Sequence, residues 1–492
     1  MPKRKRGRVD DFGFDSYLSP FTWRYGSASM RSIFSEVEKR ATWRRAWLAL
    51  AEGEQELGLL TKAELDGIRS ASGREHVDVK AAHDLEAAIR HDLMAELRVF
   101  AGQAKAGGGK LHLGATSADI EDNADVVLYQ RALDLVLANL GSCLAEAREK
   151  ITRYKGMVCM GWTHLQPAEP TTLGYRFANY AQDLVLDIKM LESVRALLSG
   201  KGVKGAVGSS ASFKELVGSD LKVGELESKV MGRLGIPSFE VATQTYPRKL
   251  DYLVLLALAS VAQSCHKFGL DLRVMQSPAF GELSEPIAER QVGSSAMPFK
   301  RNPVLAERMC SLARLVAAFP AVGFFNAANS ILERTLDDSA ARRVVMPEAF
   351  LATDECLRSY KELMRGLRVY PSMIKQNLER YGPFAGTEAV MMKAVERGAD
   401  RQKVHEAIRV KSFAAWEEVM RGRPNPIESL LASDRTISSK ITPMELKGLM
   451  KPGAHVGDTE SRCGRFVKDE VDPLVAKYSK GPKFRKGQSS VY

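Results

Sequence analysis

The sequence has few cysteines, and their positions argue against a disulfide scaffold. Six cysteines are scattered over 492 residues, and no two have the spacing of a metal-binding or redox-active pair. Unpaired, reduced thiols of this kind are typical of proteins in the cytoplasm, which is where we expect this protein to work.

The sequence also lacks a long apolar run. No apolar segment follows the basic N-terminus, as a signal peptide would require. The most apolar window, residues 252–265, lies between Asp251 and Lys267. At about 14 residues it is too short to cross a bilayer. We therefore expect a buried core helix at this window and no membrane partner.

Alternation of apolar and polar residues, the pattern of strands, is missing, whereas apolar positions at helical spacing recur throughout. The pattern therefore predicts an all-α fold whose long central helices form a bundle. The helices that we expect cover residues 61–72, 78–104, 118–155, 171–198, 220–235, 250–275, 304–319 and 347–367.

The length exceeds what one hydrophobic core usually holds, so the chain should divide into several domains. We expect three helical domains, an N-terminal one at 17–115, a central bundle at 116–368 and a C-terminal one at 369–478. The flanking stretches, 1–16 and 479–492, are rich in Lys and Arg, and we expect disordered basic tails there.

The formal net charge of +11 favours an anionic partner, either a nucleic acid or a small polyanion. Part of the excess lies in the tails, at Lys3 to Arg6 and Lys480 to Lys486. A basic helical nucleic-acid-binding protein is thus one alternative. The chain has no recognised binding motif and no interleaving of basic and aromatic residues, so we expect no nucleic-acid partner.

Short polar segments interrupt the long helices at 112–117, 163–168 and 293–302, and a further polar cluster lies at 333–343. A helix of about 25 residues spans roughly 37 Å, so one chain cannot gather all these segments at one end of its bundle. A site that uses several of them predicts an oligomer whose chains lie side by side.

The segment with the most potential functional groups is 293–303, Gly-Ser-Ser-Ala-Met-Pro-Phe-Lys-Arg-Asn-Pro. It belongs to a loop that we expect at 281–303. Its glycine and serines give a pliable backbone with spare donors, and two prolines stiffen it around Lys300, Arg301 and Asn302. Such a loop can fold over an anion and present cationic and amide donors to it. A surface linker with a solvated basic pair has the same composition.

This segment resembles the signature of the fumarase/aspartase superfamily, Gly-Ser-Ser-x-Met-Pro-x-Lys-x-Asn-Pro. Its Lys-Arg-Asn-Pro ending resembles the adenylosuccinate lyase branch, although Phe299 stands where that branch often has Tyr or His. The resemblance runs from about residue 17 to 475. Further segments that carry it are Trp43-Arg44, Arg90-His91-Asp92, His112 to Ser117, Thr163 to Ala168, Gln244-Thr245-Tyr246 and Arg334 to Ser339.

The resemblance implies elimination of fumarate from adenylosuccinate and from the succinylamino-imidazole-carboxamide ribotide SAICAR, in purine nucleotide biosynthesis. It implies a homotetramer with shared active sites, a core of packed central helices, and neither a metal nor a cofactor. A change of substrate within the superfamily remains open, to argininosuccinate lyase, fumarase, aspartase or a cycloisomerase. The Lys-Arg-Asn-Pro ending and the cluster from Arg334 to Ser339 favour the purine branch.

Elimination of fumarate removes a proton next to a carboxylate, and the charge that develops needs preorganised donors. The leaving nitrogen needs a general acid, for which histidine is suited. The resemblance implies that Ser294 is the general base, that His164 is the acid with Glu307 supporting it, and that Lys300 receives charge. The residues that it implies for substrate binding are Arg24, Tyr25, Arg90, His91, Asp92, His112, Thr116, Ser117, Gln244, Asn302, Arg308, Arg334, Ser339 and Arg343.

Overall fold

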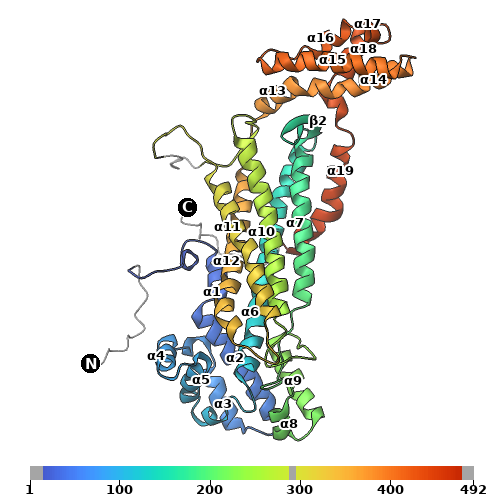
Figure 1. The fold of residues 1–492 in the computed structure, drawn as a ribbon. Helices are drawn as coiled ribbons and strands as arrows, with labels where there is room; N and C mark the ends of the chain where they lie inside the picture. Colours follow the sequence, from blue (N-terminus) through green and yellow to red (C-terminus); the bar gives the residue numbers. More distant parts are fainter. Residues whose placement is uncertain (1–14, 288–294, 479–492) are drawn as a thin grey trace.

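The computed structural model describes residues 15–287 and 295–478. The described chain is almost entirely helical, which confirms the all-α fold class (Figure 1). The first region holds the 3₁₀ turns Pro20–Thr22, Arg74–His76 and Lys105–Lys110 and the helices α1 (Ala28–Ile33), α2 (Glu36–Glu56), α3 (Lys62–Ala71), α4 (Val79–Ile89) and α5 (Asp92–Gln103).

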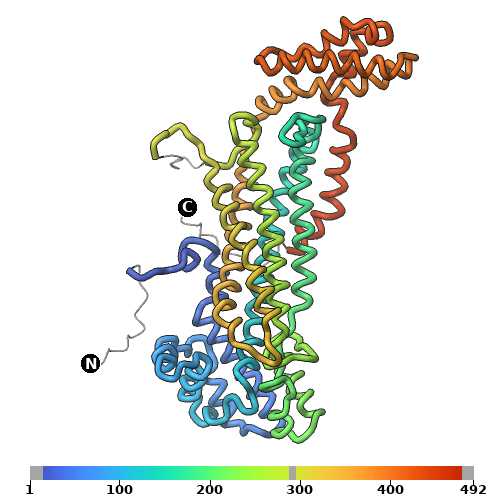
Figure 2. The backbone as a smooth tube through the Cα atoms, viewed as in Figure 1, coloured from blue at the N-terminus to red at the C-terminus, as the bar shows by residue number. Residues whose placement is uncertain are grey.

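Five long helices then run side by side and form the body of the molecule, as the tube in Figure 2 shows. They are α6 (Ser117–Tyr154), α7 (Leu173–Ala196), α10 (Lys249–Gln276), α11 (Val304–Ala328) and α12 (Asp337–Gly366). The shorter elements between them are α8 (Ala211–Val217), α9 (Asp220–Leu234) and the strands β1 (Val158–Thr163), β2 (Gln166–Thr172), β3 (Leu283–Ser284) and β4 (Arg368–Val369).

The last region begins with a group of short helices at one end of the bundle, around α15 (Arg401–Met420) (Figure 1). Then α19 (Thr459–Phe466), the π-helical turn Val467–Val471 and α20 (Asp472–Tyr478) return along the bundle and contact α6 and α7. The other elements here are α13 (Pro371–Tyr381), α14 (Gly386–Glu396), α16 (Ile427–Ala432), α17 (Arg435–Ser438), α18 (Pro443–Leu449) and the 3₁₀ turns Gly382–Ala385 and Pro452–His455.

The buried apolar side chains form three separate clusters. One fills the five-helix bundle, one joins α2, α3 and α5 with the start of α6, and one lies among α14 to α18. Cys463, Val471 and Val475 belong to the bundle cluster although they come near the end of the chain. The bundle cluster therefore extends beyond the expected central domain, and the division into three domains stays a prediction.

Two helices are longer than the sequence pattern indicated, because each continues through a proline. We expected a helix to end at Phe319, yet α11 passes Pro320 and ends at Ala328. Similarly, α12 begins ten residues before Pro347. A proline removes one N–H donor and crowds the preceding turn, and packing against neighbouring helices can offset that cost. The polar cluster at 333–343 is therefore largely helical.

The apolar window at 252–265 is only part of a longer helix. α10 has 28 residues and includes both flanking charges, Asp251 and Lys267. By length and composition alone, α10 and α11 would each be able to cross a membrane. In α10, 56% of the apolar window is buried inside the protein, against 39% in α11, so α11 leaves much of its apolar surface uncovered.

Candidate functional site

Eight of the predicted binding residues line one cavity of about 580 Å³. It lies at the end of the bundle that carries α4 and α5, where α2, the start of α6, the start of α12 and the segment before α10 meet (Figure 1). The eight residues come from sequence segments that are far apart, and they are Arg90, His91, Asp92, Ser117, Gln244, Arg334, Ser339 and Arg343.

A break between two helices places Arg90, His91 and Asp92 at this cavity. The periodicity predicted one helix over 78–104, but Arg90 has a left-handed backbone with φ of 59° and ends α4. His91 then caps α5, because its Nδ1 accepts the N–H of Met94 at 3.4 Å. The sequence pattern could not reveal this break, since a non-glycine residue rarely ends a helix in this way.

Buried carboxylates hold two of the cavity arginines, Arg248 and Arg334. Arg248 donates to both oxygens of Asp122 at 3.1 Å and to Asp338 at 2.7 Å. Arg334 donates to the other oxygen of Asp338 at 2.8 Å. Burial alone would raise the pKa of Asp338, but the two arginines lower it below its usual value. These pairs fix the guanidinium groups before any substrate arrives.

Asp338 is therefore part of a salt bridge. Adjacent carboxylates such as Asp337 and Asp338 can bind a metal, but the structure gives both residues protein partners. Asp337 accepts a hydrogen bond from Thr335 at 3.0 Å in the first turn of α12. Negative charge in this turn also stabilises the helix N-terminus.

Arg342, whose place beside Ser339 favours a binding role, also lines the cavity, together with charged residues that the sequence did not predict. Arg342 is tied inside the protein, because it donates to Asp251 at 2.7 Å, to Asp125 at 3.0 Å and to the Tyr246 hydroxyl at 2.7 Å. The spacing of four residues from Ser117 to further carboxylates along α6 is a signal that could have found two more. The charged residues of the cavity that were not predicted are Glu36, Lys39, Glu86, Glu121, Asp122, Asp125 and Arg248.

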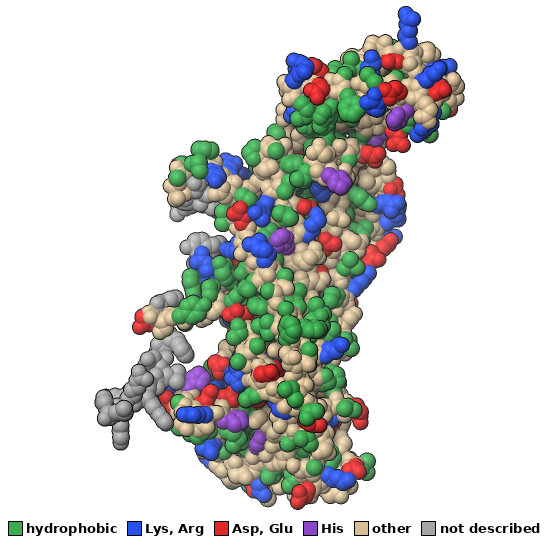
Figure 3. Space-filling view, viewed as in Figure 1, with side chains coloured by type: hydrophobic (Ala, Val, Ile, Leu, Met, Phe, Trp, Pro, Cys, Tyr) green, Lys and Arg blue, Asp and Glu red, His purple; other side chains and the backbone are tan. Residues whose placement is uncertain are grey.

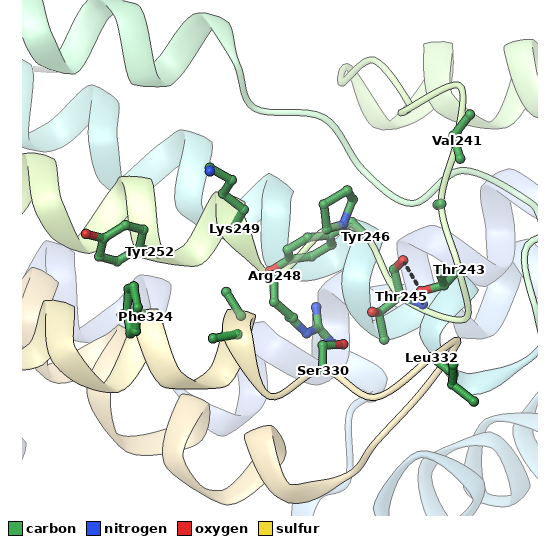
Figure 4. Close-up of a pocket in the computed structure, with 14 residues that line it drawn as sticks. Val241, Thr243, Thr245, Tyr246, Arg248, Lys249, Tyr252, Phe324, Ser330 and Leu332 are labelled. Atoms are coloured by element: carbon green, nitrogen blue, oxygen red, sulfur yellow. Dashed lines mark hydrogen bonds between the residues drawn. The ribbon is translucent and has the colours of Figure 1, made fainter.

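A second cavity of about 480 Å³ lies between the segment before α10 and the end of α11 (Figure 4). Its walls are largely apolar, with Tyr252, Phe324 and Leu332 among them. Tyr246 and Arg248 lie between Thr245 and α10 (Figure 4). Arg248 lines both cavities. Of the residues predicted for catalysis or binding that the structure describes, none lines this second cavity.

In one folded chain, His164 lies far from the first cavity. The segment at 163–168, expected as an irregular loop, is the tip of an antiparallel hairpin formed by β1 and β2. His164 and Leu165 form the turn with left-handed φ values of 54° and 59°, and both side chains are exposed. The hairpin stands at the opposite end of the bundle from α4 and α5 (Figure 1).

The described part of the signature loop leads into α11. Lys300 is exposed, and Glu307 in the first turn of the helix lies 4.0 Å from Arg273. The buried carboxylate of Glu285 accepts the N–H groups of Leu305 and Ala306 at 3.1 Å and so caps this helix. Neither Lys300 nor Asn302 lines the first cavity in the same chain. Ser294 lies outside the described residues.

Glu355, in the middle of α12, holds together a group of residues that lies outside the first cavity. Its carboxylate accepts the backbone N–H of Gly26 at 3.1 Å and lies 3.6 Å from the guanidinium of Arg308. Arg24 and Tyr25 therefore sit beside the start of α11, although nearly 300 residues separate the two segments. This group too is separate from the cavity.

His112 and Thr116 lie beside the cavity without lining it. The Nδ1 of His112 accepts the indole N–H of Trp47 at 3.0 Å, and burial lowers the pKa of this imidazole. Thr116 caps α6, where its backbone N–H donates to Asp119 at 2.8 Å. In the isolated chain, both residues hold the wall of the site in place.

A family model described as Lyase matches residues 25–317, and one described as Adenylosuccinate lyase C-terminus matches residues 383–466. The chain is 38% identical to the adenylosuccinate lyase of Schistosoma mansoni, over 94% of this chain and 97% of that protein. The chain belongs to the adenylosuccinate lyase family. The Saccharomyces cerevisiae adenylosuccinate lyase is 37% identical, over 95% of this chain and 97% of that enzyme.

Among solved structures, the fold is similar to that of 3-carboxy-cis,cis-muconate lactonizing enzyme from Pseudomonas putida. The TM-score is 0.81 at 24% identity, over 92% of this chain and 98% of that one. At this identity the likeness concerns the fold alone. The adenylosuccinate lyase family thus shares its long-helix architecture with an enzyme of different chemistry, and the choice between reactions has to come from side chains.

Proposed function

We propose that this chain is an adenylosuccinate lyase of purine nucleotide biosynthesis. It would eliminate fumarate from adenylosuccinate to give AMP, and from SAICAR to give the corresponding aminoimidazole carboxamide ribotide. The observation that carries this proposal is the cavity at α4, α5 and α12. In it, residues from four distant segments that match the family converge around fixed arginines.

The cavity suits the charged groups of such a substrate. Arg334 and Arg343 reach it from the start of α12, and His91 and Ser117 lie at the N-terminal ends of α5 and α6. Guanidinium groups and helix N-termini bind phosphate and carboxylate oxygens well. We assign these residues to the groups of the substrate that stay charged throughout the reaction.

The chemical step needs residues that the cavity of one chain does not hold. In our proposal Ser294 removes the proton next to the carboxylate, and Lys300 with Asn302 receives the charge that develops. His164, supported by Glu307, protonates the leaving nitrogen. His164 stands at the far end of the bundle, so another chain has to supply it.

We therefore propose that the working enzyme is a homotetramer whose sites combine segments of different chains. Figure 3 shows apolar side chains gathered over the middle of the bundle. Apolar side chains gathered on one face mark interaction sites, and this surface fits burial against further copies of the chain. Exposed apolar residues on α7, α10 and α11 are Leu186, Met190, Leu270, Leu315, Phe324 and Phe325.

The test is to add adenylosuccinate to the pure protein, follow the change in purine absorbance and identify fumarate as a product. Argininosuccinate, malate and aspartate serve as controls for the other reactions of the superfamily. We expect turnover with adenylosuccinate and SAICAR only. Fumarate release from a control substrate, without turnover of adenylosuccinate, would overturn the proposal. We place the enzyme in the cytoplasm, where its six free cysteines stay reduced.

A further inference from the structure

Glu121 lines the cavity from the first turns of α6, and its position suggests a role that the family resemblance does not give it. It lies one helical turn after Ser117, so both side chains lie on the same face of α6. Every other carboxylate that lines the cavity has a hydrogen bond or ion pair to a described residue. Among the described residues, Glu121 makes none.

The charges around Glu121 explain why an ionised carboxylate is unfavourable there. Asp92 on α5 and Asp122 and Asp125 on its own helix repel it, whereas Arg343 on α12 attracts it. Arg343 already donates a hydrogen bond to Asp92, so its positive charge is largely compensated and stabilises an ionised Glu121 only weakly. The remaining charged and titratable groups that line this cavity are Glu36 and Lys39 of α2, Glu86 of α4, Arg90 and His91 between α4 and α5, Tyr129 of α6, Arg248 before α10, and Arg334 and Arg342 near the start of α12.

We propose that Glu121 binds the substrate as a neutral carboxylic acid and donates its proton in a hydrogen bond to an anionic oxygen of the nucleotide. This inference rests on the proposed function, because it concerns the same cavity. The cations and carboxylates that line the cavity are nearly equal in number, so the cavity has little excess positive charge. In such a cavity an ionised Glu121 would repel a phosphate or carboxylate. Protonation turns the same side chain into a donor.

The environment of the side chain agrees with this role. Burial, followed by the charges of Asp92, Asp125 and Asp122, raises the pKa of Glu121 to about 8. Glu121 is thus largely protonated at neutral pH. An anion that accepts its proton raises that pKa further, so binding is coupled to protonation. Affinity should fall as the pH rises above about 8, because the free protein then has to take up a proton in order to bind.

The experiment measures binding of AMP by isothermal titration calorimetry on the full chain, in pairs of buffers with different ionisation enthalpies. At pH 8 the wild type should take up about half a proton more per AMP than Glu121→Gln, and at pH 6.5 the difference should vanish. Between pH 7 and pH 9 the Kd of the wild type should rise about tenfold more than that of Glu121→Gln. Glu86→Gln, which removes a different carboxylate of the same cavity, should keep the wild-type pH dependence.

A third variant, Glu121→Leu, distinguishes the effect of the hydrogen bond from the effect of the charge. Glu121→Gln keeps a neutral donor and should bind AMP at pH 7 as the wild type does, whereas Glu121→Leu should bind about tenfold more weakly. A parallel titration with fumarate tells whether the acceptor belongs to the phosphate or to the succinyl group. Equal proton uptake by wild type and Glu121→Gln with both ligands would overturn the inference. If AMP failed to bind to any form while fumarate was still produced, the inference would fail but the proposed reaction would stand.

Discussion

Arg248, the residue before α10, donates to both carboxylate oxygens of Asp122 on α6 at 3.1 Å, across 126 residues of sequence. Both side chains are almost fully buried, with exposed fractions of 2% and 4%. The same guanidinium also reaches Asp338 at the start of α12. A single arginine therefore joins three helices at the wall of the cavity, and its loss should affect the whole region.

Replacement of Arg248 by methionine should destabilise the protein by about 3–5 kcal/mol, because two buried carboxylates lose their counter-charge. Urea unfolding of the wild type and the variant measures the difference. Arg365→Met is the matched control, since Arg365 pairs with Glu146 at 2.9 Å but is 63% exposed. That surface pair should contribute less than about 1 kcal/mol. Equal losses in the two variants would show that the Arg248 network is not a special source of stability.

The sequence was sufficient to predict the fold class and most of the long helices, because their apolar residues recur at helical spacing over many turns. It was insufficient at Arg90, where a left-handed residue ends α4, and at Pro320 and Pro347, where helices continue through proline. In each case tertiary packing outweighs the local preference. The hairpin at His164 was missed because β2 contains two prolines, Pro167 and Pro170, which favoured an irregular loop.

The site residues that belong to motifs were predictable from the sequence. The residues that charge pairing in the fold brings to the site were not. Arg90, Ser117 and Arg334 lie in segments that resemble the family motifs and do line the cavity. Arg248 and Glu121 lie outside the motif segments that carry the resemblance, and only the folded chain shows what surrounds them. Pairing between distant segments, such as that of Arg248 with Asp122, leaves no periodic signal in a single sequence.

Glu54 gives a prediction about pH and stability. It lies on α2 with an exposed fraction of 1%, and its Oε1 has no hydrogen-bond partner among the described residues. Burial raises the pKa of Glu54 to about 8 from a model-peptide value near 4.5. The folded protein therefore holds this proton more tightly than the unfolded chain does. The stability that comes with the proton is fully present below about pH 4.5 and is lost as the pH rises through about 8.

Glu54→Gln should accordingly raise the melting temperature at pH 9 and leave it nearly unchanged at pH 5. The gain in the free energy of unfolding at pH 9 should be at most roughly 5 kcal/mol, the limit that the pKa difference sets. Thermal unfolding at the two pH values measures it. A variant with the same shift at both pH values would show that Glu54 does not titrate between them.

Lys300 and Arg334 should affect different kinetic constants. In the proposed mechanism Lys300 acts on charge that develops during the reaction, whereas Arg334 is fixed in the cavity by Asp338 and acts on groups that are charged throughout. Lys300→Ala should therefore mainly lower kcat, and Arg334→Ala should mainly raise KM. Steady-state kinetics with adenylosuccinate distinguishes the two. The reverse pattern would mean that these two roles have to be exchanged.

The shared-site arrangement predicts that two inactive variants restore each other. His164 lies at one end of the bundle and His91 at the other, so in a tetramer one site would take them from different chains (Figure 1). His164→Gln should lower turnover by about 10²–10⁴-fold through loss of the general acid. His91→Asn removes the imidazole and keeps a residue that can cap α5, so the fold should be retained.

The two variants are dissociated together, reassembled in equal amounts and assayed for fumarate release, with each variant alone as the control. Each site then receives an intact His164 with a chance of about one half and an intact His91 with the same chance, so roughly a quarter of wild-type activity should return. Native mass spectrometry of differently tagged chains confirms that mixed tetramers have formed. Mixed tetramers without activity would mean that both histidines of a site come from one chain. Because the two residues stand at opposite ends of the bundle, the chain would then have to refold extensively on assembly, and the shared-site proposal would be wrong.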